Sequence, residues 1–490
     1  MPFAVSTTYG KVAGLEHDGV TKFLGIPYAA SPTGPLRFRA PAPPPAWDGI
    51  REATAFSAKP PKPDYAAPFD VLLPEPNIPG DDWLTVNVWT PGGSGLPVMV
   101  WIYGGGFSNG NSAIPEYDGH TFARDGVVLV SLNYRLGVDG FAFLPDAPPN
   151  RGLLDQIAAL EWVRDNIAAF GGDPGNVTVF GESAGAMSIT TLLAMPRARG
   201  LFAKAITQSG STQAAADPAD AALVTGELGL AIGREATAAS LAGLPRPALI
   251  AAQATVRDAL GAQPDPARFG ASIVASSMAF IPVIDGDLLP THPMASIAAG
   301  AAADIPLLTG TNSEEYRLFL VPSGMAAHIS DELLASLLPI LGISPSVAQL
   351  YRSNRPGAAP SDILAALLTD MFFRLPALAI AEARMDGAAP TYVYEFAWQS
   401  PVGGLGACHS LEIPFVFDNL SAAGAELVIG SDRPQHLADQ MHQAWVSFAR
   451  DGDPGWREFD KAYPVQVFRD SGGSVELDPH ADERAIWSNG

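Results

Sequence analysis

Runs of consecutive apolar residues mark the predicted strands of this chain. The most apolar runs lie at 97–103 and 127–134, and further runs lie at 176–180, 204–208, 306–310 and 391–396. The runs are continuous rather than alternating, which is typical of strands covered on both faces in a parallel sheet. We therefore expect these segments to lie together in the interior of one large sheet.

Segments with helical periodicity separate these runs. Between 153 and 170, apolar side chains recur at three- and four-residue steps and predict one amphipathic helix. Gly171 and Pro174 then end it, because glycine accepts the left-handed conformation and proline cannot continue a helix. Alternating strands and helices predict an α/β fold with a large, mostly parallel central sheet flanked by helices.

The whole chain, residues 1–490, is predicted to form a single α/β domain. Its 490 residues could hold two or three average domains, but large α/β enzymes often reach this length as one. Helical sequence from roughly 213 to 390 interrupts the sheet pattern, and we expect it to form a cap insertion and one wall of a pocket. The proline-rich range 41–80 is expected to be an ordered surface loop or lid.

Composition excludes several classes of protein. Hydrophobic residues make up 47% of the chain and charged residues 16%, so a sizeable core is expected and disorder is excluded. The net charge of −22 argues against nucleic acid as a partner, because no basic patch is available for phosphates. We find no apolar stretch of membrane-spanning length and no signal peptide, so no membrane partner is expected. A single cysteine, Cys408, excludes an intramolecular disulfide and predicts a cytoplasmic location.

The most informative motif is Gly181-Glu182-Ser183-Ala184-Gly185, between the predicted strand at 176–180 and an apolar helical stretch at 186–193. Gly-x-Ser-x-Gly between a strand and a helix is typical of a nucleophile elbow, in which the serine stands on a sharp turn at the carboxyl edge of the sheet. In a chain with 49 glycines, an ordinary turn is the alternative. The flanking strand and helix favour the elbow.

A serine hydroxyl becomes a good nucleophile when a base takes its proton and a carboxylate orients that base. Six of the eight histidines follow the predicted strand at 204–208, and the pattern alone leaves the choice among them open. We prefer His409, because it comes after the strand at 391–396 and the glycine-rich loop at 403–406. A loop after a strand is where such a fold places its base.

Backbone donors for an oxyanion are predicted at two places. Gly104, Gly105 and Gly106 follow the strand at 97–103, and their bare backbone lets N–H groups approach a substrate closely. Ala184, the residue after the predicted nucleophile, supplies another N–H group. A plain turn is the alternative for the three glycines, and the nearby elbow motif argues against it.

The chain resembles the type B carboxylesterases, which share their fold with the cholinesterases and the bacterial para-nitrobenzyl esterases. Besides the elbow, the resemblance is carried by FLGIPYA at 23–29, LTVNVWTP at 84–91, NYRLG at 133–137, GLLDQ at 152–156, FGGDP at 170–174, GTNSEE at 310–315 and HSLEIPF at 409–415. It implies an α/β-hydrolase fold with helical cap insertions. It also implies a serine hydrolase that cleaves small-molecule carboxylic esters through an acyl-enzyme intermediate, with no metal or organic cofactor, as a monomer or small homo-oligomer.

Matched residue by residue, the resemblance implies Ser183 as the nucleophile, Glu315 as the acid of the triad and His409 as the general base. Glu314 competes with Glu315, and the spacing of the family motif selects Glu315. Tyr316 departs from the family, which usually has glycine after the acid.

The same comparison assigns the groups around the triad. Gly105, Gly106 and Ala184 match the oxyanion donors of the family. Ser209 matches a serine that hydrogen-bonds near the triad, with an ordinary strand-end residue as the alternative. Glu182, beside the nucleophile, is expected to be structural rather than catalytic.

Two scaffold ion pairs are also implied, Arg37 with Asp82 and Arg135 with Asp155. Candidate residues for the wall of the pocket are Phe107, Tyr65, Phe69 and Phe319, with simple core packing as the alternative. Some relatives with this fold bind partners and catalyse nothing, but here every catalytic position is filled. An amide, carbamate or lactone in place of an ester stays open, because the same machinery cleaves all of them.

Overall fold

The predicted apolar runs form neighbouring strands of one eleven-stranded sheet in the structure, a computed structural model that describes residues 4–210, 212 and 214–488. The strand order is β14-β13-β12-β11-β10-β9-β7-β8-β6-β4-β3. These strands span Leu15–His17 (β3), Val20–Pro27 (β4), Thr85–Thr90 (β6), Leu96–Ile102 (β7), Val128–Leu132 (β8), Gly172–Glu182 (β9), Lys204–Gln208 (β10), Leu307–Asn312 (β11), Thr391–Phe396 (β12), Pro464–Arg469 (β13) and Gly472–Leu477 (β14). A smaller sheet joins Ala4–Ser6 (β1), Lys11–Ala13 (β2) and Ile50–Glu52 (β5).

The middle of the large sheet is parallel. All neighbours from β8 through β7, β9, β10, β11 and β12 to β13 run in the same direction. Antiparallel pairs lie toward its two ends. This confirms the predicted large, mostly parallel sheet, and the burial of β8, β10, β11 and β12 along their whole length explains why their sequences are apolar without alternation.

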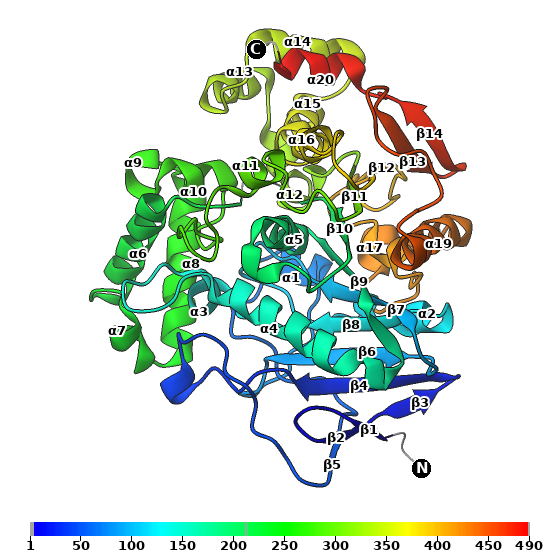
Figure 1. Cartoon of the computed structure of the whole chain (residues 1–490). Helices are drawn as coiled ribbons and strands as arrows, with labels where there is room; N and C mark the ends of the chain where they lie inside the picture. The colour runs from blue at the N-terminus through cyan, green and yellow to red at the C-terminus, as the bar shows by residue number, and fades with distance from the viewer. Residues whose placement is uncertain (1–3, 211, 213, 489–490) are drawn as a thin grey trace.

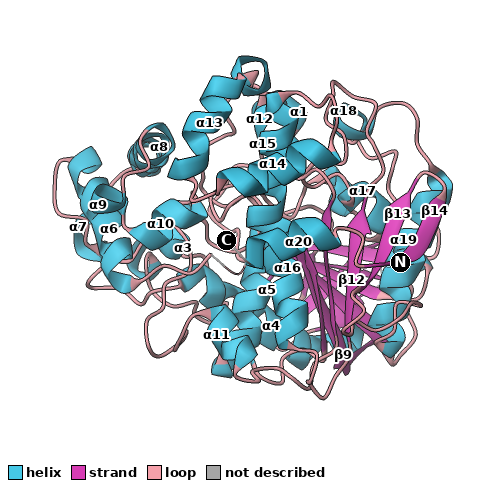
Figure 2. Ribbon diagram, turned by 90° about the horizontal axis from the view of Figure 1, so that it is seen from above, coloured by secondary structure: helices cyan, strands magenta, loops and turns pink. Residues whose placement is uncertain are grey.

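Helices cover both faces of this sheet (Figures 1 and 2). One face carries Arg151–Asn166 (α4), Ala184–Ala194 (α5) and Leu375–Ala383 (α16), and the other carries His120–Arg124 (α2), Ile413–Val416 (α17) and Gln435–Asp451 (α19). The helix predicted at 153–170 corresponds to α4 and a following 3-10 turn. It ends, as predicted, at Gly171, whose φ of 93° lies in the left-handed region.

Helices dominate the range in which a cap insertion is expected, although residue 213 lies outside the described residues. Strand β11 divides this range, so one helical section precedes it and a second follows it (Figure 1). The first section holds Pro218–Ile232 (α6), Ala238–Ala242 (α7), Arg246–Ala262 (α8), Pro266–Phe269 (α9), Ala271–Ser276 (α10) and Pro293–Ala298 (α11). The second holds Arg317–Leu320 (α12), Asp331–Ile340 (α13), Pro345–Asn354 (α14), Pro360–Thr369 (α15), a π-helix at Asp370–Arg374 and α16. The C-terminal helix Ala481–Ser488 (α20) packs against α14 at the top of Figure 1.

The continuous helix Pro360–Ala383 corrects one expectation. Its 24 residues are long and apolar enough to cross a membrane, whereas the sequence was expected to hold no such stretch. In the structure, 72% of its most apolar window is buried inside the protein. The apolar side chains of this helix are therefore accounted for by packing within the core.

One of the two expected ion pairs is confirmed and the other is wrong. Arg135 and Asp155 form a fully buried bidentate pair, with Nε–Oδ2 and Nη2–Oδ1 distances of 2.8 and 2.7 Å. Arg37 instead pairs with Asp139, with Nε 3.3 Å from Oδ1, and the expected partner Asp82 is exposed. The guanidinium of Arg37 also donates to the carbonyls of Leu241, Ala242 and Leu244 at the end of α7, which draws it away from the loop that carries Asp82.

Candidate active site

Ser183 stands on a sharp turn between strand β9 and helix α5. Its φ of 54° and ψ of −123° lie outside the regions that side chains of L-residues usually allow. A Cβ atom at Gly181 or Gly185 would lie 2.4 or 1.9 Å from the carbonyl oxygen of Ile102, so both positions require glycine. Ser183 is partly exposed while its neighbours on both sides are buried. The turn therefore presents the serine hydroxyl as its accessible group.

His409 and Glu315 are hydrogen-bonded partners, although they lie far apart in the sequence. His409 Nδ1 is 2.7 Å from Glu315 Oε2, and Glu315 is fully buried. The other carboxylate oxygen, Oε1, accepts hydrogen bonds from Ser209 Oγ at 2.5 Å and from the Asn312 backbone N–H at 2.7 Å. Each oxygen of this buried carboxylate has a donor, so the imidazole is held in one orientation.

Glu314, the competing acid, faces elsewhere. Its Oε2 accepts a hydrogen bond from the Ala407 backbone N–H at 3.0 Å, and its Oε1 lies 3.6 Å from Arg317 Nη1. Of the two neighbouring carboxylates, Glu315 is the one that the structure brings to His409. Tyr316, which replaces the usual glycine of the family motif, lines the adjacent cavity.

The sequence did not predict that Glu182 contacts the general base. In the described part of the chain, His409 Nε2 contacts Glu182 Oε1 at 3.0 Å rather than the hydroxyl of Ser183, and Ser410 Oγ donates to the same oxygen at 2.6 Å. Burial lowers the pKa of His409, but the carboxylates of Glu182 and Glu315 outweigh burial and raise that pKa to about 9. The position of Glu182, directly before the serine at the carboxyl end of β9, was the available sequence signal.

The three glycines after β7 form a tight turn beside Ser183. A Cβ atom at Gly104 would lie 2.9 Å from Ser183 Cβ, and one at Gly105 would lie 2.4 Å from the Asn109 carbonyl oxygen. The turn is closed by the carbonyl of Gly105, which accepts from the N–H groups of residues 108 and 109, so these bonds do not use the N–H of Gly105. Gly105 and Gly106 line the same cavity as Ser183.

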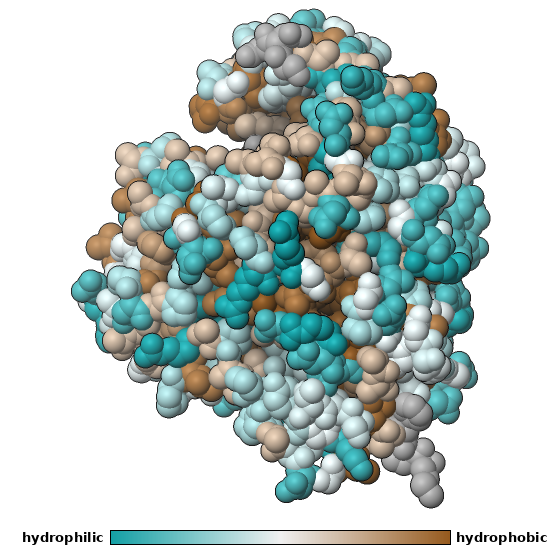
Figure 3. All heavy atoms as spheres, viewed as in Figure 1, coloured by the Kyte–Doolittle hydropathy of each residue, from teal (hydrophilic) through white to brown (hydrophobic). Residues whose placement is uncertain are grey.

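An apolar cavity of about 390 Å³ lies over Ser183 and His409. Its walls include Tyr65, Phe69 and Phe319, as the sequence suggested, together with Leu73, Met187, Ala214, Met278, Leu318, Phe372 and Phe373. The expectation for Phe107 is wrong, because this side chain is fully buried and packs edge-on against Phe141. Some of these lining residues follow α10 and others belong to α12. On the face shown in Figure 3, a notch separates the upper part of the molecule from the part at the left.

A second cavity of about 80 Å³ adjoins the first. It shares Gly105, Glu182 and His409 with the first cavity, and Glu75 and Glu116 make its walls more polar. His409 thus borders both spaces, and Ser183 lines the larger one. Among the described residues, no group of three or more His, Cys, Asp or Glu side chains is arranged to hold a metal ion.

Comparisons with known proteins find matches over nearly the whole chain. Residues 2–482 match the model of the carboxylesterase family. The para-nitrobenzyl esterase of Bacillus subtilis (strain 168) is 39% identical, over 98% of this chain and 97% of that protein. Phenmedipham hydrolase of Pseudarthrobacter oxydans is 36% identical, over 96% of each protein. A crystal structure of a carboxylesterase from Geobacillus stearothermophilus has a TM-score of 0.86 at 37% identity and covers 99% of both chains.

Proposed function

Because the chain belongs to the carboxylesterase family and hydrolyses carboxylic esters as a serine hydrolase, we propose that Ser183, His409 and Glu315 form its catalytic triad. The observation that carries this proposal is the meeting of three segments at one cavity. The elbow presents Ser183, the loop after β12 presents His409, and the buried Glu315 holds the imidazole at 2.7 Å.

In the acylation step, His409 Nε2 takes the hydroxyl proton of Ser183 while Oγ attacks the ester carbonyl carbon. The carbonyl π bond opens and its electron pair forms the oxyanion of a tetrahedral intermediate. The N–H groups of Gly105, Gly106 and Ala184 stabilise this oxyanion. When the intermediate collapses, the bond to the alcohol oxygen breaks, and the alcohol leaves with the proton from His409.

In the deacylation step, water takes the place of the alcohol. His409 removes one proton from the water, and the resulting oxygen nucleophile attacks the acyl carbon. Collapse of the second tetrahedral intermediate breaks the bond to Ser183 Oγ, which recovers its proton from His409. The carboxylic acid leaves, and the two steps as written use no cofactor.

The contact between His409 and Glu182 is a feature of the free enzyme, before an ester is bound. Catalytic hydrogen bonds are often long or misaligned in a free enzyme and tighten when the substrate is bound. We propose that Nε2 exchanges the carboxylate of Glu182 for the hydroxyl of Ser183 as the ester fills the cavity. Glu182 then faces the imidazolium that forms when the proton is transferred.

The two cavities support a substrate with one large apolar group and one small group. The larger cavity, about 390 Å³, fits an apolar acyl or aryl group, and the smaller one of about 80 Å³ fits the other side of the ester. A screen of acyl length against alcohol size tests this division. If esters with two bulky groups were hydrolysed as fast as esters with one bulky and one small group, this division would be contradicted.

The proposed nucleophile is tested by replacing Ser183 with alanine. We expect hydrolysis of para-nitrophenyl butyrate to fall by at least about 10⁴-fold, because the histidine and the oxyanion donors alone retain little catalysis. Ser323→Ala, at an exposed position, is the matched control and keeps wild-type turnover. Circular dichroism checks that both variants are folded. Wild-type turnover in folded Ser183→Ala would exclude this serine as the nucleophile.

A further inference from the structure

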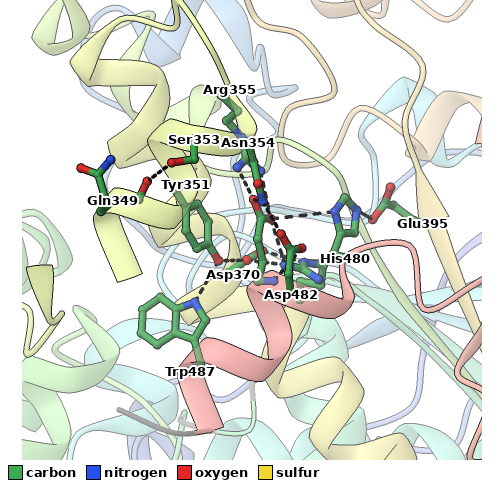
Figure 4. A network of polar contacts seen from close by, with 12 residues as sticks. Gln349, Tyr351, Ser353, Asn354, Arg355, Asp370, Glu395, His480, Asp482 and Trp487 are labelled. Atoms are coloured by element: carbon green, nitrogen blue, oxygen red, sulfur yellow. Dashed lines mark hydrogen bonds and ion pairs between the residues drawn. The ribbon is translucent and has the colours of Figure 1, made fainter. Parts of the chain in front are cut away.

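A network of buried polar side chains joins the C-terminal helix α20 to the π-helix Asp370–Arg374 (Figure 4). Arg374 Nε donates to Asp370 Oδ1 at 2.6 Å, and the hydroxyl of Tyr351 donates to Asp370 Oδ2. Trp487 of α20 donates from Nε1 to the Tyr351 hydroxyl at 2.8 Å. Three elements, α14, the π-helix and α20, are therefore connected through one tyrosine hydroxyl.

Glu483 is the charged residue through which α20 enters this network. It is 2% exposed, accepts a hydrogen bond from Asn354 Nδ2 at 3.0 Å, and pairs with Arg355. Its Oε2 also lies 3.5 Å from Arg374 Nη2. A buried carboxylate needs such partners, because an unpaired buried charge is strongly unfavourable. The pairing therefore fixes the position of α20 against the π-helix.

The opposite side of the π-helix forms part of the wall of the active-site cavity. Phe372 and Phe373 both line the cavity. The Phe373 ring lies 4.9 Å from the imidazole of His409, and Phe372 stacks on Tyr316 at 5.8 Å. A π-helical turn inside an α-helix often occurs at a functional site. Here the turn places charged residues toward α20 and aromatic residues toward the substrate space.

We propose that Asp370, Arg374 and Glu483 are positioning residues for ester hydrolysis, which hold the π-helix so that Phe372 and Phe373 stay at their places in the cavity wall. This inference rests on the proposed function of the Ser183 site. Fully paired buried polar networks are rigid, so the C-terminal helix sets the width of a cavity that it does not touch. Displacing catalytic or substrate-positioning groups by about 1 Å is enough to change rates strongly.

The proposal is tested with Glu483→Gln and Tyr351→Phe, which remove one charge and one hydroxyl and leave the side-chain shapes almost unchanged. We expect kcat/KM for para-nitrophenyl octanoate to fall about 3- to 30-fold, chiefly through a higher KM, because the long acyl chain uses the aromatic wall. For para-nitrophenyl acetate, whose short acyl group makes the least contact with that wall, we expect a change of less than about twofold.

Asp331→Asn is the matched control, because it removes the same charge from an exposed position, where Asp331 pairs with Arg352 of α14 outside this network. It is expected to retain the wild-type ratio of octanoate to acetate rates. Active sites are counted by titration, so both rates refer to active molecules, and a merely structural loss of active enzyme leaves the ratio of the two rates unchanged. An unchanged ratio, or an equal loss for both esters, in both test variants would overturn the proposal. Absence of any hydrolysis in the wild-type chain would instead overturn the proposed function, and this inference with it.

Discussion

At the scale of single residues, the charge on His409 decides when Ser183 reacts. The imidazole must be neutral to accept the serine proton. Burial lowers its pKa, but Glu182 and Glu315 raise it to about 9. The fraction of enzyme with a neutral, competent imidazole therefore grows as the pH rises toward 9.

Glu182→Gln tests this account of the pH dependence. Removing a carboxylate 3.0 Å from Nε2 makes the imidazolium less favourable, so the pKa of His409 falls. We expect the acid limb of the kcat/KM profile to move about 1–3 pH units lower. Glu314→Gln, which changes a carboxylate that does not face the imidazole, is the control with a wild-type profile. An acid limb that stays in place or moves to higher pH in Glu182→Gln would contradict the assignment.

At the scale of elements, the turn from β9 to α5 is the most constrained part of the site. Gly185→Ala places a methyl group 1.9 Å from the Ile102 carbonyl oxygen, so β7 and α5 must separate. We expect a loss of at least about 1–3 kcal/mol in the free energy of unfolding, together with a loss of activity. Urea unfolding followed by fluorescence measures the first effect.

Gly226→Ala in helix α6 is the matched control for this prediction. A Cβ atom there meets nothing within 4 Å. Because alanine is the better helix former, the variant is expected to gain about 0.5–1 kcal/mol. If the two variants were equally stable, the close packing inferred at the elbow would be wrong.

The sequence was sufficient for elements whose burial is uniform. Strands β7 and β8 are apolar along most of their length, β9 to β12 each contain a shorter apolar run, and α4 has a clear stripe, so each could be predicted from a local pattern. Strand β3 has three exposed residues and β5 has three as well, so no pattern marked them. Phe107 was misplaced because an aromatic residue after a glycine turn can face either the cavity or the core.

The site was predictable to a similar extent. Ser183 could be found because its whole geometry is local, and the family spacing distinguished Glu315 from Glu314. The contact of Glu182 with His409, and the place of Phe373 beside the same ring, depend on segments that are distant in sequence. Local patterns contain no information on such contacts, so these residues required the structure.

At the scale of the whole molecule, ion pairs show how far the scaffold could be inferred. Arg135, which follows β8, and Asp155 of α4 were paired correctly on the family resemblance. The partner of Arg37 was predicted wrongly, because a pair with Asp82 depends on the conformation of the surface loop that carries Asp82, which the sequence pattern does not determine. The neighbouring Asp81 is contacted instead by Arg246 of α8.

Asp155→Asn tests the importance of the buried pair. It leaves the guanidinium of Arg135 buried without its countercharge, so the free energy of unfolding is expected to fall by about 3–5 kcal/mol. Asp165→Asn breaks an exposed pair with Arg164, and we expect it to change the free energy of unfolding by less than about 0.5 kcal/mol. Guanidinium unfolding of both variants measures the difference. A similar, small effect of the two changes would show that the buried pair contributes little.

Covalent labelling tests whether Ser183 is the activated nucleophile of this esterase. The purified chain is treated with diisopropyl fluorophosphate, and the modified peptide is identified by mass spectrometry. We predict one adduct per chain, on Ser183, formed in proportion to the loss of esterase activity. An adduct on a different residue, or full loss of activity with Ser183 unmodified, would contradict the account.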